Sequence, residues 1–369
     1  MSRPIVAHVY PGNMFGGVES ALLGLATGAE GAFEHRFVLF WDGPLAERLE
    51  ALGREVSRLR PARYSRPASV LRAQLALGRE LRRRRPDVLL CHSSWSHALA
   101  APVARLTRLP LVFFQHGPIE RPGWLDRLAR RGGADLVLVN SQHVARTAPL
   151  FPTAKRVVQP LPIVLPEVAP DAGPEARRAL EVPDDALLLL IAARLEAWKG
   201  HALLLDTLAA LPEGLRWRCW IAGAGQTDRE KGHEAAMRAR VTELGLGDRV
   251  RWLGYRNDVP ALMEAADLYV QPNLGPEPYG LAFVEALVHG CPVVTTAMGG
   301  ALEIVDAETG MLRPPDPEAL AEAVVSLADP ERRASMAAAA RRRGRALADP
   351  RRRVDELDAH LAALLRGGA

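Results

Sequence analysis

Both halves of the chain repeat one alternation, in which short apolar runs are separated by stretches with helical periodicity. The helical stretches include residues 18–28, 69–85, 202–210 and 283–289. Alternation of this kind is typical of strand–helix–strand units around a parallel sheet. We therefore predict the α/β class, with two doubly wound, Rossmann-like domains. The predicted strands are residues 5–9, 37–40, 88–91, 111–115 and 136–140 in the first half, and 186–194, 217–222, 250–253, 268–271 and 292–295 in the second.

A proline-rich segment separates the two halves. Residues 160–174 contain five prolines, and no helical or strand period survives that spacing. The 369 residues also suit two domains better than one. The predicted domains are residues 1–165 and 166–348, followed by a helical segment within 349–369 that can cap either domain. Ligands of this architecture bind at the carboxyl ends of the strands, so we expect a cleft between two sheets.

Composition limits the classes of protein that fit. The chain is 48% hydrophobic and 24% charged, as in folded globular proteins. Its longest apolar run, residues 186–193, is far shorter than the roughly 20 residues of a membrane-spanning helix. The amino-terminal segment lacks the apolar region of a signal peptide, so we expect a cytoplasmic protein. Three scattered cysteines do not predict a disulfide framework.

The net charge of +4 combines two opposite imbalances. Residues 1–165 contain 23 Lys and Arg against 12 Asp and Glu, whereas residues 166–369 contain 24 against 31. The first half is therefore basic, at +11, and the second acidic, at −7. The arginine run at residues 82–85 ends an amphipathic helical pattern, which would be attracted to an anionic membrane surface. A solvated arginine-rich helix is the alternative.

The most informative segment is residues 273–303, which follows a predicted strand. Glu277 lies in a Gly/Pro-rich loop, Gly280 and Leu281 open a helix, and Glu285 lies in its second turn. The N–H groups at a helix start can bind a diphosphate, and a carboxylate on either side can accept hydrogen bonds from hydroxyls. A polyhydroxyl ligand with a central diphosphate is a nucleotide sugar. The alternative is that both glutamates are solvated, but Glu285 is embedded in an apolar stretch, where a lone charge is costly.

Two cations follow the first predicted strand of the second half. Arg194 ends the strand, and Lys199 lies after a short loop. Cations at a strand end can neutralise a diphosphate through charge-assisted hydrogen bonds. An exposed ion pair is the alternative for both.

The first half offers weaker signals. Gly16 and Gly17 lie between a strand and a helix, where backbone can approach a ligand or simply turn. His116 follows a predicted strand and can reach a sugar or a phosphate oxygen, although a structural histidine is the alternative. No zinc motif, P-loop, nucleophile elbow or complete dinucleotide fingerprint is found, so we expect no metal site and no nicotinamide cofactor.

Together these motifs resemble the retaining glycosyltransferases of family 4, which have the GT-B fold. The resemblance rests on the Gly16–Gly17 turn, on Arg194 with Lys199, and on a pair of glutamates, Glu277 and Glu285, separated by seven residues. It extends over nearly the whole chain through Gly290, Pro292, Gly299, Gly300 and Glu303. In this family the final helix crosses back to the first domain.

The resemblance also implies roles for single residues. Arg194 and Lys199 would bind the donor diphosphate, with backbone at Gly17, Gly280 and Leu281. Glu277 would contact the donor sugar and Glu285 the ribose. The backbone near Arg256 would hold the base, and His116 would lie near the donor sugar, so that His116, Glu277, Arg194 and Lys199 form the catalytic set. Tyr279 stands where Phe is commoner in the family.

The activity implied is metal-independent transfer of a hexose from a UDP- or GDP-linked donor to a hydroxyl acceptor, such as a glycan, a lipid-linked saccharide or a small molecule. Cations and a helix amino terminus would replace the metal, so no cofactor is expected. No nucleic-acid partner is indicated. A nucleotide-sugar epimerase and a noncatalytic nucleotide-sugar-binding module are the competing hypotheses.

Overall fold

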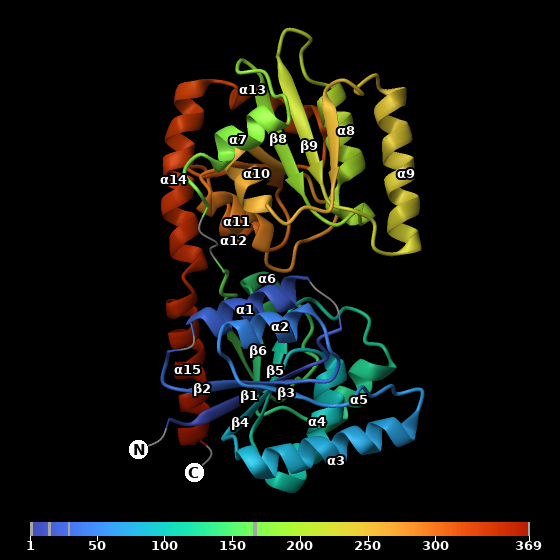
Figure 1. Cartoon of the computed structure of the whole chain (residues 1–369), viewed down its shortest axis with the longest axis vertical. Helices are drawn as coiled ribbons and strands as arrows, with labels where there is room; N and C mark the ends of the chain where they lie inside the picture. Colours follow the sequence, from blue (N-terminus) through green and yellow to red (C-terminus); the bar gives the residue numbers. More distant parts are fainter. Residues whose placement is uncertain (1–2, 14–15, 29, 165–167, 368–369) are drawn as a thin grey trace. The chain divides into compact units, whose positions relative to one another are not determined.

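The computed structural model describes residues 3–13, 16–28, 30–164 and 168–367. The chain forms two compact units (Figure 1). Unit 1 comprises Met1–Val164 together with Asp349–Ala369, and unit 2 comprises Leu165–Ala348. Each unit contains one parallel sheet with helices beside it, which confirms the predicted α/β class and the pair of Rossmann-like sheets.

Unit 1 contains a seven-stranded parallel sheet in the order β3-β2-β1-β4-β5-β6-β7. Its strands are β1 (Ile5–Tyr10), β2 (Glu34–Leu39), β3 (Val56–Arg58), β4 (Val88–Cys91), β5 (Leu111–Gln115), β6 (Leu136–Val139) and β7 (Lys155–Val158). Its helices are α1 (Gly17–Gly28), α2 (Pro44–Ala51), α3 (Pro67–Arg84), α4 (Ser94–Thr107), α5 (Trp124–Gly132), α6 (Gln142–Ala145) and α15 (Pro350–Gly367).

Unit 2 contains a six-stranded parallel sheet in the order β10-β9-β8-β11-β12-β13. Its strands are β8 (Leu187–Ala192), β9 (Trp217–Ala222), β10 (Val250–Gly254), β11 (Leu268–Gln271), β12 (Val293–Thr296) and β13 (Gly310–Arg313). Its helices are α7 (Ala172–Ala179), the 3-10 turn η1 (Ala197–Lys199), α8 (His201–Ala209), α9 (Asp228–Glu243), α10 (Val259–Ala265), α11 (Leu281–Val288), α12 (Ala301–Ile304), α13 (Pro317–Ser326) and α14 (Pro330–Ala348).

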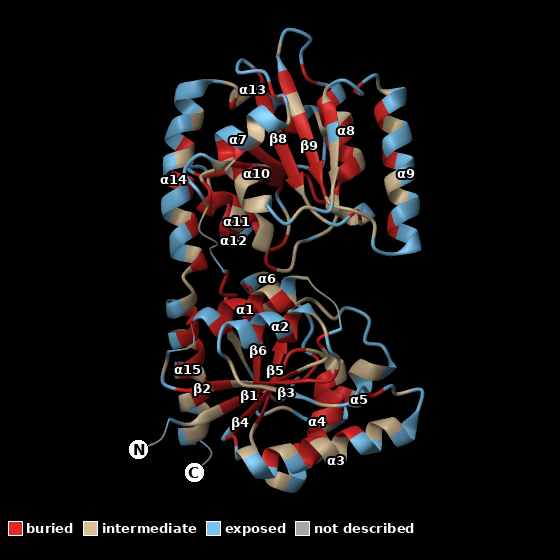
Figure 2. Cartoon of the chain, viewed as in Figure 1, coloured by how far each residue is buried: buried red, intermediate tan, exposed pale blue. Residues whose placement is uncertain are grey.

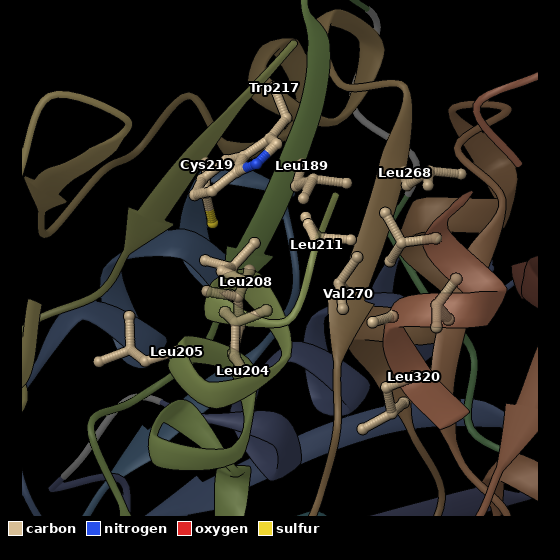
Figure 3. Close-up of a cluster of buried hydrophobic side chains, with 14 of the residues drawn as sticks. Leu189, Leu204, Leu205, Leu208, Leu211, Trp217, Cys219, Leu268, Val270 and Leu320 are labelled. Carbon is tan, nitrogen blue, oxygen red and sulfur yellow. The ribbon is translucent and has the colours of Figure 1, made fainter. Parts of the chain in front are cut away.

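In each unit the buried residues concentrate along the central strands and on the inner faces of the helices (Figure 2). Strand β8, with the sequence Leu-Leu-Leu-Leu-Ile-Ala, is buried over its first five residues, as expected for a central strand of a parallel sheet covered on both faces. Leucines of α8 and α13 pack with residues of β8, β9 and β11 in one cluster (Figure 3). This core holds the strand ends of unit 2 in place.

The final helix, α15, packs against α1 within unit 1. Its Val354, Leu357 and Leu361 are fully buried. A side chain at Gly28 of α1 would collide with the backbone of Pro350, at the start of α15. Gly28 therefore allows close packing of the two helices.

The structure corrects several predicted boundaries. Strands β3, β7 and β13 were not predicted, because they are edge strands that are only partly buried and contain arginines, which interrupt an apolar run. The predicted linker is wrong in its second part, since α7 begins at Ala172. Pro174 lies in the first turn of α7, where a missing N–H costs no intrahelical bond.

We predict that Leu357→Ala destabilises unit 1 by about 2–5 kcal/mol, because it leaves a cavity where a fully buried side chain of α15 was packed. Hydrogen exchange should accelerate in α1 and α15 while unit 2 keeps its protection. Leu204→Ala, in the core of unit 2, is the matched control and should give the reverse pattern. Unchanged exchange of α1 in the Leu357 variant would contradict the role of α15 in this core.

Candidate functional site

Three loops of unit 2 leave the sheet at the same edge. They follow the adjacent strands β8, β11 and β12, which run parallel, so their carboxyl ends lie together. The loop after β8 carries Arg194 and Lys199, and the loop after β11 carries Glu277. Arg194 lies two residues beyond the end of β8 instead of within it, because the strand stops at Ala192.

Lys199 and Glu277 come into direct contact at this edge. The Lys199 Nζ lies 2.8 Å from the Glu277 Oε2, and both side chains are largely buried, at 16% and 13% exposure. The Asn273 amide donates a second hydrogen bond to the same oxygen, at 3.1 Å. The backbone carbonyl of Glu277 accepts the Gly300 N–H at 2.7 Å. Hydrogen bonds thus hold both the carboxylate and the backbone of Glu277.

A chain of buried polar side chains supports this pair from within the sheet. The Tyr269 hydroxyl donates to the Gln271 Oε1 at 2.6 Å, and the Gln271 amide donates to the Asn273 Oδ1 at 2.9 Å. All three residues are buried. Sequence reasoning missed Gln271 and Asn273, although polar residues at every second position of a buried strand could have signalled them.

Two glycines permit backbone shapes that a side chain would prevent. Gly200, which links η1 to α8, has a φ of +79°, and a Cβ there would collide with the Pro272 carbonyl. Gly280 has a φ of +108° and precedes α11. Because glycine offers no side-chain cap, the first N–H groups of α11, beginning at Leu281, are left for other acceptors.

Arg194 is held by two acidic residues. Its guanidinium lies 2.7 Å from Glu196 and 3.5 Å from Glu230, and its side chain is 42% exposed. Glu230 also accepts the backbone N–H groups of Gln226 and Thr227. Arg194 therefore has charged partners in this structure, neither of which the sequence reasoning singled out.

Glu285 lies in α11 between buried apolar neighbours, Val284 and Ala286. Desolvation of its carboxyl group raises its pKa to about 7. Arg256 follows β10 and pairs with Asp258 at 2.8 Å. Neither Glu285 nor Arg256 is hydrogen-bonded or ion-paired to Lys199 or Glu277.

The remaining candidates belong to unit 1. Gly17 begins α1, and the Gly16 carbonyl accepts the Ser20 N–H at 3.0 Å. His116 follows β5 and stacks on Phe114 with ring centroids 4.4 Å apart, and its Nε2 lies 3.1 Å from the His92 Nδ1. Its backbone carbonyl accepts the Asn140 amide at 2.7 Å. His92 and Asn140 were not among the predicted site residues.

Three further observations concern the described residues as a whole. Within them, no group of three or more His, Cys, Asp or Glu side chains is arranged to hold a metal ion. None of their helices is long and apolar enough to cross a membrane. All three cysteines are buried and without a disulfide.

Two Rossmann-like units, with charged residues and a helix amino terminus at the sheet edge of unit 2, fit the GT-B class of glycosyltransferase folds. Residues 15–160 match the sequence family described as Glycosyltransferase Family 4, and residues 173–343 match Glycosyl transferases group 1. The chain belongs to family 4 of the glycosyltransferases, and it is a glycosyltransferase of the GT-B fold.

Named relatives support this assignment. A lipopolysaccharide core biosynthesis mannosyltransferase of Rhizobium meliloti, LpsB, is 29% identical over 237 residues, which cover 63% of this chain and 66% of that protein. The human α-1,3/1,6-mannosyltransferase is 28% identical over 76% of this chain and 74% of its own. A D-inositol 3-phosphate glycosyltransferase of Saccharomonospora viridis is 34% identical over 56% of this chain and 51% of its own.

Solved structures share the fold. HepE of Anabaena, determined with UDP and glucose, superposes with a TM-score of 0.83 at 24% identity and covers 97% of this chain and 99% of its own. WaaG, described as a glycosyltransferase of lipopolysaccharide biosynthesis, superposes with a TM-score of 0.66 at 21% identity over 95% and 98% of the two chains.

We predict that Glu285→Gln removes a pH-dependent loss of stability. The folded carboxyl group titrates near 7, and the unfolded one near 4.5. Between these values the unfolded chain releases the proton while the folded chain keeps it, so the free energy of unfolding falls as pH rises. The variant cannot ionise, so its stability relative to the wild type should be higher at pH 8 than at pH 4.5.

Denaturant unfolding at the two pH values measures this difference. Glu243→Gln, an exposed position on α9, serves as the control and should show no such dependence. An equal effect of Glu285→Gln at both pH values would contradict the prediction.

Proposed function

We propose that the protein transfers a hexose, with retention of anomeric configuration and without a metal, from a UDP- or GDP-linked sugar to a hydroxyl of a glycan or lipid-linked saccharide. The observation that carries the proposal is the Lys199–Glu277 contact at the carboxyl edge of the unit 2 sheet. Family membership supports sugar transfer, and the mannosyltransferase names of two relatives support a hexose donor. The UDP bound in the HepE structure supports a nucleotide donor.

The donor would be bound through opposite charges. Arg194 and Lys199 are the first two cations after the end of β8, and the uncapped start of α11 offers N–H groups to a diphosphate. Glu277, fixed by Asn273 and the Gly300 N–H, would accept hydrogen bonds from hydroxyls of the sugar. Glu285, with its raised pKa, would meet the ribose.

The chemistry needs stabilisation of the departing nucleoside diphosphate. As the glycosidic bond breaks, negative charge grows on the diphosphate while the sugar acquires oxocarbenium character. Preorganised cations and helix N–H groups stabilise such charge without reorganising, which would fulfil the task of a metal. Attack by the acceptor hydroxyl from the same face gives retention and needs no covalent nucleophile.

A panel of UDP- and GDP-sugars, tested for binding and for slow hydrolysis, is the direct test. We predict that Lys199→Ala and Glu277→Ala each lower turnover of the accepted donor about a hundredfold to a thousandfold, the usual effect of removing one preorganised charge stabiliser. Lys231→Ala, an exposed lysine of α9, is the matched control and should turn over normally.

Near-normal turnover by Lys199→Ala or Glu277→Ala would refute the site. Incubation of the wild type with the donor and without an acceptor distinguishes a transferase from a nucleotide-sugar epimerase. Conversion of one nucleotide sugar into another would establish an epimerase, whereas a transferase gives at most slow hydrolysis.

A second proposal concerns the basic unit 1 and an anionic membrane surface. Helix α3 exposes Leu71 and Leu75, at 58% and 53%, in line with the exposed Arg79 and Arg82. An apolar stripe beside cations suits the interface of an anionic bilayer. Two arginines of the 82–85 run, Arg83 and Arg84, are paired with Glu80, so the run is less basic than its sequence suggests.

We predict that the protein sediments with vesicles containing anionic phosphatidylglycerol and not with neutral phosphatidylcholine vesicles. The double variant Leu71→Glu and Leu75→Glu should lose this binding, because it places two negative charges on the stripe. Leu302→Glu, an exposed leucine of unit 2, is the control. Absence of lipid-dependent sedimentation in the wild type would leave α3 as a solvated helix.

A further inference from the structure

Four histidines form a diagonal row across adjacent strands of unit 1. His35 lies on β2 and His8 on β1, while His92 and His116 directly follow β4 and β5. His35 of β2 is opposite Val6 of β1, so His8 lies two residues beyond His35 in the strand direction. His8 is in turn opposite Leu90 of β4, so His92 lies two residues beyond His8. Leu90 is opposite Val112 of β5, which places His92 level with Phe114. His116 therefore lies two residues beyond His92. Because side chains alternate with a period of two, all four rings lie on one face.

The row is continuous through hydrogen bonds between the rings. The His116 Nε2 lies 3.1 Å from the His92 Nδ1, and the His92 Nε2 lies 2.9 Å from the His8 Nδ1. The His8 Nε2 lies 2.8 Å from the His35 Nδ1. The row ends at Asp358 of α15, whose Oδ1 lies 3.0 Å from the His35 Nε2.

The row is enclosed in the interior of unit 1. His8, His35, His92 and Asp358 are at most 4% exposed. Burial lowers the pKa of His8 and of His92 and lowers that of His116 to about 3, so these three rings are neutral near pH 7. The second carboxylate oxygen of Asp358 accepts the Phe33 N–H at 3.0 Å. Asp358 is therefore the hydrogen-bond acceptor at the α15 end of the row.

With one proton on each ring, this acceptor sets the direction of every hydrogen bond. A carboxylate only accepts, so the His35 Nε2 carries its proton and its Nδ1 is a lone pair. His8 must then donate from Nε2, and the same holds for His92 and His116. The His116 Nδ1 is left as a lone pair, and this atom is buried without a hydrogen-bond partner among the described residues.

We propose that Asp358, acting through His35, His8 and His92, fixes His116 in the Nε2–H tautomer, so that its Nδ1 accepts a hydrogen bond from a hydroxyl of the bound sugar. The contact between His116 and a sugar hydroxyl rests on the proposed function, whereas the tautomer of His116 follows from the hydrogen bonds of the row alone. Asp358 and the three inner histidines are positioning residues, because they act only through His116. A buried carboxylate that sets the tautomer of a histidine has large effects where that histidine meets substrate.

The first test is NMR of the full-length wild type with ¹⁵N-labelled histidine at pH 8. The expected result is a protonated Nε2 and an unprotonated Nδ1 for His116, His92, His8 and His35. A proton on the His116 Nδ1 would overturn the proposal, and this measurement requires no variant.

The second test is Asp358→Asn, which is nearly isosteric. Its single carbonyl oxygen must face the Phe33 N–H, a fixed donor, so its NH₂ group faces the His35 Nε2 and turns that atom into an acceptor. Every hydrogen bond in the row then reverses, and the His116 Nδ1 gains a proton. Asp355→Asn, an exposed carboxylate on the same helix, is the matched control and should leave all four tautomers unchanged.

Kinetics distinguish a positioning role from a structural one. In Asp358→Asn we expect kcat/KM for the accepted sugar nucleotide to fall at least about tenfold, the loss expected for one well-placed hydrogen bond. The affinity for the matching nucleoside diphosphate alone, UDP or GDP, which lacks the sugar, should remain within about twofold. A fall in kcat/KM without reversal of the tautomers, or reversal without a fall, would overturn the link to the sugar. If no donor is turned over by the wild type, the proposed function fails and the NMR result still decides the tautomer.

Discussion

The parallel direction of the strands is the constraint on which the rest of the structure depends. Parallel strands end at one edge, so loops that are distant in sequence converge there, and Lys199 meets Glu277 across 78 residues. The same sheets are covered by helices on both faces, which makes their strands apolar. Polar side chains inside such a sheet must find partners, because an unpaired buried polar group is costly. The chain of buried polar side chains from Tyr269 to Glu277 satisfies this requirement, because each side chain is hydrogen-bonded to the next, and the chain ends at the candidate site.

The fold class and much of the candidate site could be predicted from the sequence, because both depend on local patterns. Apolar runs mark central strands, and a Gly/Pro-rich loop after a strand marks the start of α11. Short edge strands such as β3 leave no such mark, since a half-buried stretch of three residues has no detectable period. One partner of Arg194 was equally invisible, because Glu230 is 36 residues away and reaches Arg194 only through tertiary packing.

The histidine row shows this limit most clearly. Nothing in the spacing of His8, His35, His92 and His116 indicates a common line, because their sequence separations depend on the lengths of helices and loops. The line appears only when the register of three strand pairs is known. A shift of one residue in any pair would turn a ring to the opposite face and interrupt the row. Long-range register is a property of packing, which a local pattern does not contain.

The position of the carboxylate at the far end of the row has an electrostatic reason. A carboxylate beside His116 would fix its tautomer directly, but it would also add a full negative charge that repels the proposed ligand, whose diphosphate is itself negative. Like charges in a poorly hydrated site repel strongly. Three intervening imidazoles transmit the direction of the hydrogen bonds without transmitting the charge, and Asp358 stays in the interior between α15 and the sheet. The close packing of α15 against α1 at Gly28 has a second consequence, because it brings the acceptor that orients His116 into unit 1.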